Sequence, residues 1–239
     1  MDDIFLKYMD NRFKEKDHHL FIKKITESIN HGPVITISRE AGCSANKIAE
    51  MLVSSINENY YFNSDDKWNW INRAIIAESA KELNLPPHKI KYIFDSEKKG
   101  IIDDVISALA SRYYKSDMQI KKAIFKLIEL YAIKGNIIIV GRGGVSLTNH
   151  IKKSLHIKLQ APLNWRINKI SEKHKISFDI AKKYVTEMDK KRIQLINNFM
   201  GRKADNSIFD IIFNCKTMKQ IEIVETIIKL AEIKKLISK

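Results

Sequence analysis

The chain has 239 residues, enough for one α/β domain with an insertion and too few for two catalytic domains of ordinary size. Hydrophobic residues make up 44% and charged residues 29%, as in globular proteins, and no stretch reaches the roughly 18 apolar residues of a membrane span. The net charge of +14 favours polyanionic partners, although lysines on solvated helix faces would produce the same value.

The N-terminus and the cysteines indicate the compartment. The N-terminus lacks the apolar core of a signal peptide, and Cys43 and Cys215 lie far apart in the sequence. We therefore expect a cytoplasmic protein with reduced thiols, no disulfide framework and no membrane partner. Most basic residues are lysines, so each arginine is a more specific candidate for a phosphate contact, because a guanidinium forms bidentate bonds to phosphate oxygens.

The first half of the chain alternates between helical and extended patterns. Residues 1–32 carry apolar side chains at helical spacing and predict an N-terminal helical arm. The β-branched run at 34–37 predicts a buried strand, which leads through a turn at 38–47 into a helix. Residues 68–134 predict a helical insertion, with helical periodicity from Trp70 onwards.

The second half repeats the strand-then-helix order. Further strands are expected at 137–140, 155–159 and 208–214. Basic helices are expected over 164–203 and a closing helix over 217–237. Short apolar strands that alternate with helices predict an α/β fold over 33–239, with a parallel sheet of about five strands between two helical layers.

Ser38–Lys47 is the first candidate site. A strand that passes through a tight loop into a helix N-terminus forms an anion site, because free backbone N–H groups converge there and the helix dipole favours negative charge. The segment lacks the usual GxxxxGK[ST] pattern: Ile37 stands where the first glycine belongs, Ala45 takes the lysine position, and Lys47 falls near the Ser/Thr position. An ordinary connection between a strand and a helix would have the same shape.

The same segment, VITISREAGCSANKIAEML, resembles the opening of the cytidylate kinase-like family of P-loop nucleoside monophosphate kinases. The matching residues are Ser38, Arg39, Glu40, Gly42, Ile48, Ala49 and Leu52. The resemblance implies a P-loop NTPase-like fold with a substrate-binding insertion over 68–134 and a lid region over 164–203. It also implies an ATP site with Mg²⁺ bridging the phosphates. Its phosphate loop would comprise Ser38, Arg39, Glu40, Gly42, Cys43, Ser44, Ala45, Asn46 and Lys47.

A second match lies at the end of the 137–140 strand. The Gly-Arg-Gly there resembles a strand end that faces the substrate phosphate in related kinases, which implies a phosphate contact for Arg142. Gly141 and Gly143 permit close approach of a ligand or form a tight turn, and Gly143 replaces the aspartate of the related enzymes. Trp70 and Arg73, at the start of the insertion, are candidates for binding the acceptor nucleotide.

A third match is the Ala-Pro-x-x-x-Arg segment that ends at Arg166, and a fourth is the Asp-x-x-Arg step of Asp189 and Arg192. In kinases of this kind, lid arginines fold over the transferring phosphoryl group and offset its charge. The resemblance thus implies catalytic roles for Arg166 and Arg192, with Asp189 holding Arg192 within one helical turn. A surface ion pair is the alternative.

Three functions follow. The first is phosphoryl transfer from ATP to a nucleoside monophosphate, with a cytidine nucleotide as acceptor by analogy alone. The second is a catalytically inactive, kinase-like nucleotide-binding or regulatory protein, because of Ala45 and the missing aspartate. The third, not favoured, is a basic module that binds nucleic acid. The magnesium ligand and the oligomeric state are not predicted.

Overall fold

The computed structural model of the chain describes residues 32–72, 128, 131–132 and 134–238. Almost all of the expected N-terminal arm and most of the expected 68–134 insertion, including Arg73, lie outside the described residues. These two predictions therefore stay predictions.

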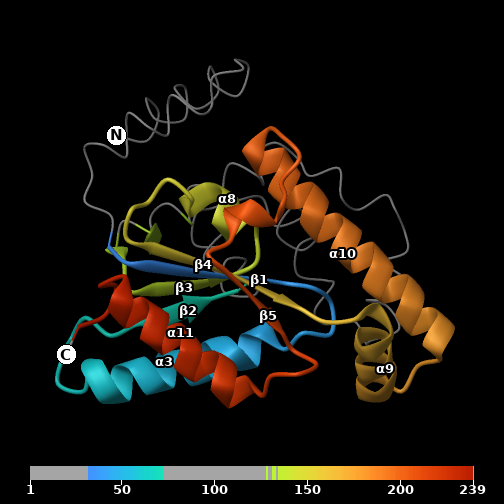
Figure 1. Ribbon diagram of the computed structural model, residues 1–239, viewed down its shortest axis with the longest axis horizontal. Helices are drawn as coiled ribbons and strands as arrows, with labels where there is room; N and C mark the ends of the chain where they lie inside the picture. Colours follow the sequence, from blue (N-terminus) through green and yellow to red (C-terminus); the bar gives the residue numbers. More distant parts are fainter. Residues whose placement is uncertain (1–31, 73–127, 129–130, 133, 239) are drawn as a thin grey trace, which may run out of the picture.

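A parallel five-stranded sheet forms the centre of the molecule (Figure 1). Its strands, in spatial order, are β2 (Asn69–Ile71), β3 (Ile137–Val140), β1 (Val34–Arg39), β4 (Ser154–Gln160) and β5 (Ile211–Asn214). Every neighbouring pair is parallel. The central strands are apolar on both faces, which is the pattern of strands covered by helices above and below.

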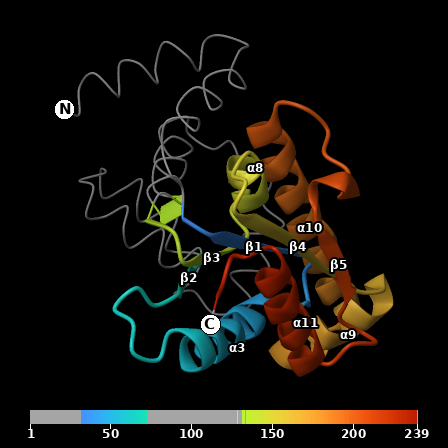
Figure 2. The ribbon, with the colours of Figure 1, turned by 60° about the vertical axis from the view of Figure 1, so that its left-hand side comes forward.

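Helices cover both faces of this sheet (Figures 1 and 2). On one face lie α3 (Ala45–Tyr60) and α11 (Gln220–Ile233), which bury Leu52 and Ile227 completely against the strands. On the other lie α8 (Gly144–Thr148) and α10 (Phe178–Met200). A further helix of the described part of the chain, α9 (Leu163–His174), packs against α10 beyond the carboxyl end of β4. The predicted three-layer α/β/α fold is confirmed.

Two elements differ from the sequence-based expectation. Trp70 and Ile71, where a helix was expected, lie in edge strand β2, because the adjacent Trp68 is fully buried and both its backbone N–H and its C=O bond the Asn57 side chain. The strand expected from residue 208 begins only at Ile211, after a 3₁₀ turn at Asn206–Ile208. No helix in the described part of the chain is long and apolar enough to cross a membrane.

Candidate functional site

The carboxyl ends of β1 and β3 define the site. These strands are neighbours, and the chain leaves β1 towards α3 on one face of the sheet but leaves β3 towards α8 on the other. Ligands of open α/β sheets bind in the crevice at such a switch point. Two loops therefore border the candidate site: the loop between β1 and α3, and the turn between β3 and α8.

The loop between β1 and α3 leaves backbone donors exposed. Its own bonds run from Glu40 N–H to Leu159 C=O at 2.9 Å, from Cys43 N–H to Glu40 C=O at 3.2 Å and from Ala45 N–H to Cys43 C=O at 2.8 Å. Within the described ranges, no acceptor is present for the backbone N–H groups of Gly42, Ser44, Asn46 and Lys47. Ser44, Asn46 and Lys47 are exposed, so these donors lie where an anion can reach them.

The bulky residues of this loop do not cover its donors. The side chain of Cys43 turns inward, is 7% exposed and joins the apolar core, where it meets Cys215. Ala45 is also buried, whereas Asn46 is exposed and Lys47 pairs with Glu50 one turn along α3 at 3.8 Å. The backbone N–H groups at the start of α3 therefore stay accessible although the usual glycines are absent.

Gly42 lets the loop close over Arg166. Its φ of +92° is unfavourable for any residue with a side chain, and a Cβ at this position would lie 3.1 Å from the Cβ of Arg166. The loop backbone and helix α9 thus pack in direct contact. The glycine of the Ser-Arg-Glu-x-Gly segment is required by this packing as well as by the turn.

Arg166 lies beneath the loop, with its side chain only 7% exposed. Its Nε donates to Ala161 C=O at 2.9 Å and lies 3.1 Å from Glu40 Oε2. Its Nη1 donates to Asp189 Oδ2 at 2.5 Å and to Ala41 C=O at 3.3 Å. The resemblance implied an arginine that faces the transferring phosphate; in this structure, protein oxygens bind Nε and Nη1 of Arg166, and these bonds brace the loop.

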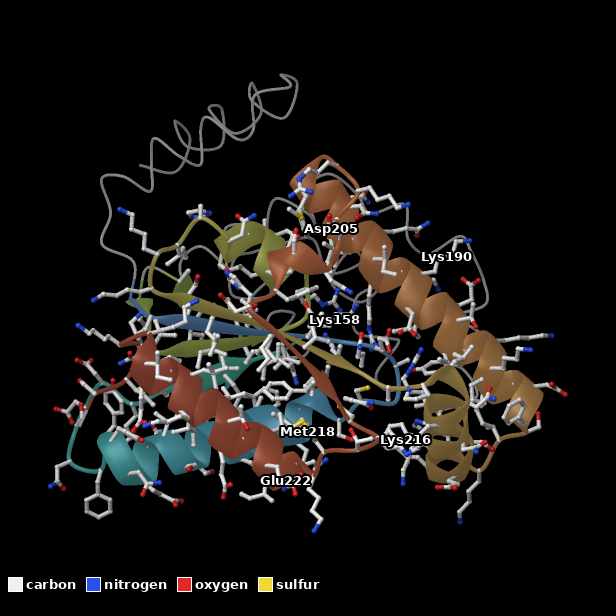
Figure 3. All side chains as sticks on the ribbon, viewed as in Figure 1. Lys158, Lys190, Asp205, Lys216, Met218 and Glu222 are labelled. Atoms are coloured by element: carbon white, nitrogen blue, oxygen red, sulfur yellow. The ribbon has the colours of Figure 1, made fainter. Side chains whose placement is uncertain are left out.

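Asp189 has a larger role than the expected pairing with Arg192. Its Oδ1 accepts the Ala41 N–H at 2.7 Å while its Oδ2 accepts Arg166, so one carboxylate ties helix α10 to both the loop and α9. Arg192 Nη1 lies farther away, 3.6 Å from Asp189 Oδ1, and donates to Arg39 C=O at 3.3 Å. Lys190, which follows Asp189 in α10, is exposed and points away from the sheet (Figure 3).

The side chain of Arg39 faces the other loop, the turn after β3. A Cβ at Gly141 would lie 1.6 Å from Arg39 Nη1, so the guanidinium occupies the space that any side chain at 141 would need. Gly141 has φ +73° and Arg142 follows it with φ +57°. Arg39 was expected among the ATP-loop residues; the structure brings it to the turn that carries Arg142, with Arg192 bonded to its carbonyl.

Two further residues that were expected to bind substrate, Gly143 and Trp70, pack against other parts of the protein. The space beside Gly143 is filled by Phe199 of α10, since a Cβ at this glycine would lie 2.4 Å from Phe199 Cδ2. Gly143 therefore serves packing rather than close approach of a ligand. Trp70 is half-buried and packs against the apolar core from strand β2.

The described residues form no all-protein cage for a magnesium ion. Among them, no group of three or more His, Cys, Asp and Glu side chains is placed to hold a metal. The carboxylates nearest the loop, Glu40 and Asp189, are both engaged with Arg166. Mg²⁺ in phosphoryl-transfer sites is usually held by water and substrate phosphates with one or two protein ligands, so it would enter with ATP, and we derive no step through a protein-bound metal.

A buried histidine adjoins the site without entering it. His156 of β4 bonds Thr36 Oγ1 of β1 through Nδ1 at 2.9 Å and Ser154 Oγ through Nε2 at 3.1 Å. Burial lowers the pKa of His156 from 6.5 to about 4, against the opposing influence of Asp210. The ring is neutral at physiological pH and joins strands β1 and β4.

A model of the cytidylate kinase-like family matches residues 34–217, which include both loops, the sheet and the α9–α10 pair. The chain belongs to the cytidylate kinase-like family. The match covers every described residue of the site, so the resemblance in the sequence is confirmed. A search of curated proteins found no match.

A solved structure shares the fold of this cytidylate kinase-like protein. An uncharacterized protein from Eubacterium ventriosum ATCC 27560 superposes with a TM-score of 0.59 at 17% identity, over 84% of this chain and 98% of the other. Shikimate kinase from Acinetobacter baumannii, in complex with shikimate, gives a TM-score of 0.47 at 10% identity over 89% and 98%. At these identities the likeness concerns the fold alone.

Proposed function

We propose that this cytidylate kinase-like protein transfers a phosphoryl group from ATP to a nucleoside monophosphate. One observation carries the proposal: the open N–H groups at the start of α3 and the arginine-bearing turn after β3 follow the carboxyl ends of two neighbouring parallel strands, β1 and β3. The first surface suits the phosphates of the donor, because backbone N–H groups and the helix dipole attract negative charge. The second suits the phosphate of the acceptor.

The chain's own groups act mainly by position and charge. Arg39 and Arg142 lie at the turn after β3, and Arg192 is joined to Arg39 through its carbonyl. Guanidinium groups near a transferring phosphoryl group stabilise the negative charge spread over its oxygens. Asp189 and Arg166 hold the donor loop against α9 and α10, so the two phosphate-facing surfaces keep a fixed separation.

The test is a coupled assay with the magnesium complex of ATP and each common nucleoside monophosphate. We expect turnover with at least one acceptor and a loss of roughly 100-fold or more in kcat/KM for Arg142→Ala, because one transition-state charge partner is removed. Arg202→Ala is the matched control, since Arg202 is an exposed arginine beyond α10 and donates only to the neighbouring Lys203 C=O. Absence of turnover with every acceptor contradicts the proposal.

A second candidate is a kinase-like protein that binds ATP without transferring its phosphoryl group. It is supported by Gly143 in place of the family's aspartate and by the engagement of Glu40 and Asp189 with Arg166. Calorimetry distinguishes the two candidates: saturable ATP binding without turnover favours the second, and turnover that Arg142→Ala abolishes excludes it.

A further inference from the structure

The two cysteines of the chain meet at the candidate phosphate loop although they lie far apart in the sequence. Cys43 is buried in the loop between β1 and α3, and Cys215 follows the last residue of β5. Both pack in the same apolar core cluster, and each thiol is the strongest influence on the pKa of the other. Neither takes part in the proposed transfer of a phosphoryl group.

The backbone explains why they meet. Strand β4 lies between β1 and β5, and its last two residues bind the chain on either side. Leu159 C=O accepts the Glu40 N–H at 2.9 Å, and Gln160 C=O accepts the Cys215 N–H at 2.8 Å. The turn at Gly42 then brings Cys43 back over the end of β4. The segment after β5 that carries Lys216 and Met218 lies beside α9, at the same end of the sheet (Figure 3).

The two thiols are not equivalent. Cys43 is only 7% exposed, whereas Cys215 is partly accessible. The hydrogen bond with Cys215, together with burial, raises the pKa of Cys43, and the same hydrogen bond lowers the pKa of Cys215. Cys215 therefore supplies the thiolate that reacts first with a reagent from solvent.

We propose that Cys43 and Cys215 form a reversible disulfide that locks the phosphate loop to the end of β5. The oxidant is a low-molecular-weight disulfide. The Cys215 thiolate attacks one of its sulfurs and releases one thiolate; Cys43, having lost its proton, then attacks the Cys215 sulfur of the mixed disulfide and releases the second. Two protein thiols and one small disulfide thus become one protein disulfide and two small thiols.

The disulfide changes the loop because the backbone around Cys215 is more rigid than the backbone around Cys43. Cys215 is held by the sheet through its bond to Gln160, whereas Cys43 lies in a turn whose neighbour Gly42 tolerates unusual backbone angles. A disulfide bond of about 2.05 Å is shorter than any contact between two thiols. Closure therefore moves Cys43, and with it the flanking N–H groups of Gly42 and Ser44, and restrains them.

The first experiment treats the full-length protein with oxidised glutathione, blocks remaining thiols and measures mass with peptide mapping. We expect both free thiols to disappear, a monomer that has lost two hydrogen atoms, a Cys43–Cys215 linked peptide, and full reversal by dithiothreitol. Cys215→Ser is expected to lose the link and to retain an unmodified Cys43. Stable glutathione adducts on both cysteines, or links between two chains, overturn the proposal.

The second experiment measures amide hydrogen exchange of residues 40–47 in the reduced and oxidised forms. Locking predicts at least several-fold slower exchange of these amides on oxidation, and equal exchange in both forms overturns it. Cys215→Ser, treated in the same way, is expected to show no change. This readout does not depend on ATP.

We also expect the disulfide to weaken ATP binding, and this expectation rests on the proposed function. Calorimetry is expected to show at least a threefold higher Kd for ATP in the oxidised form, and unchanged affinity in oxidant-treated Cys215→Ser. Failure of the reduced protein to bind ATP would count against the proposed function, while the linked peptide and the exchange rates still decide the disulfide. Equal affinities in the two forms would contradict the effect on the site.

Discussion

The loop after β1 and the turn after β3 begin at the same edge of the sheet, and both depend on glycines with positive φ. They nevertheless end as different surfaces. The first leaves backbone donors open at the start of the 16-residue helix α3, whereas the second is filled by Arg39 and by Phe199 and leads into the five-residue helix α8. A strand, a glycine and a helix in succession therefore do not by themselves determine an anion site made of backbone N–H groups. What packs into the turn decides it.

The largest expected effect concerns the brace of the first loop. Arg166→Met keeps a side chain of similar length but leaves Glu40 and Asp189 without their buried cation. We expect a loss of about 3–5 kcal/mol in the free energy of unfolding, because partly buried carboxylates lose their countercharge. Urea denaturation measures it. Arg202→Met, at an exposed site, is the control, and an equal loss in both variants would contradict the bracing role.

The next largest effect is a loss of folding stability at acidic pH, caused by His156 in strand β4. His156 has a pKa of about 4 in the folded protein against 6.5 when exposed, so the unfolded chain binds more protons between these values. The stability due to the neutral ring is present above pH 6.5 and is lost as the pH falls towards about 4, with a total of about 3 kcal/mol.

Denaturation curves between pH 4 and 7 measure this loss. The variant His156→Gln keeps two polar groups near Thr36 and Ser154 but has no proton to gain. Its stability is expected to vary less with pH over the same window. A slope equal to that of the wild type would show that another group is responsible.

A substitution at Gly143 tests how tightly Phe199 packs against the turn after β3. Gly143→Ala places a methyl group against Phe199 and forces alanine to φ +67°, and we expect a loss of about 2–3 kcal/mol. Gly201→Ala is the matched control: its φ is +65°, but nothing lies within 4 Å of the added methyl group, so only the backbone cost of about 1 kcal/mol remains. Equal losses would show that Phe199 yields without cost.

The smallest effect on stability is expected at Gly42, in the open loop. A methyl group there would approach Arg166 at 3.1 Å and adopt φ +92°, which we expect to cost about 1–2 kcal/mol. Its effect on ligand binding is expected to be larger: calorimetry should show at least tenfold weaker ATP binding, because the neighbouring N–H groups are displaced. Gly143→Ala should change ATP affinity much less. A larger loss of ATP affinity in Gly143→Ala than in Gly42→Ala would mean that the turn after β3, and not the loop after β1, binds ATP.

Local pattern alone was sufficient for much of the fold. The β-branched runs at 34–37 and 137–140 became β1 and β3, because apolar strands of this length are stable only when helices cover both faces. The short strand β2 was missed, since three residues are too few to display a period, and its formation depends on Trp68 being held by Asn57. Family membership was also readable from four motifs in order, and the family match over residues 34–217 confirms it.

The sequence by itself thus determined the order of the elements, the family and the residues from which a site is built. Tertiary structure alone decided what those residues do: Arg166 and Asp189 brace the loop, Arg39 turns to Gly141, and Cys43 meets Cys215. The physical reason is distance along the chain. Local hydrogen bonds and hydrophobic periodicity act over a few residues, whereas these contacts form only when the parallel strands bring their carboxyl ends to one edge of the sheet. More than 100 residues separate the members of three such pairs: Arg39 and Gly141, Arg166 and Ala41, and Asp189 and Ala41.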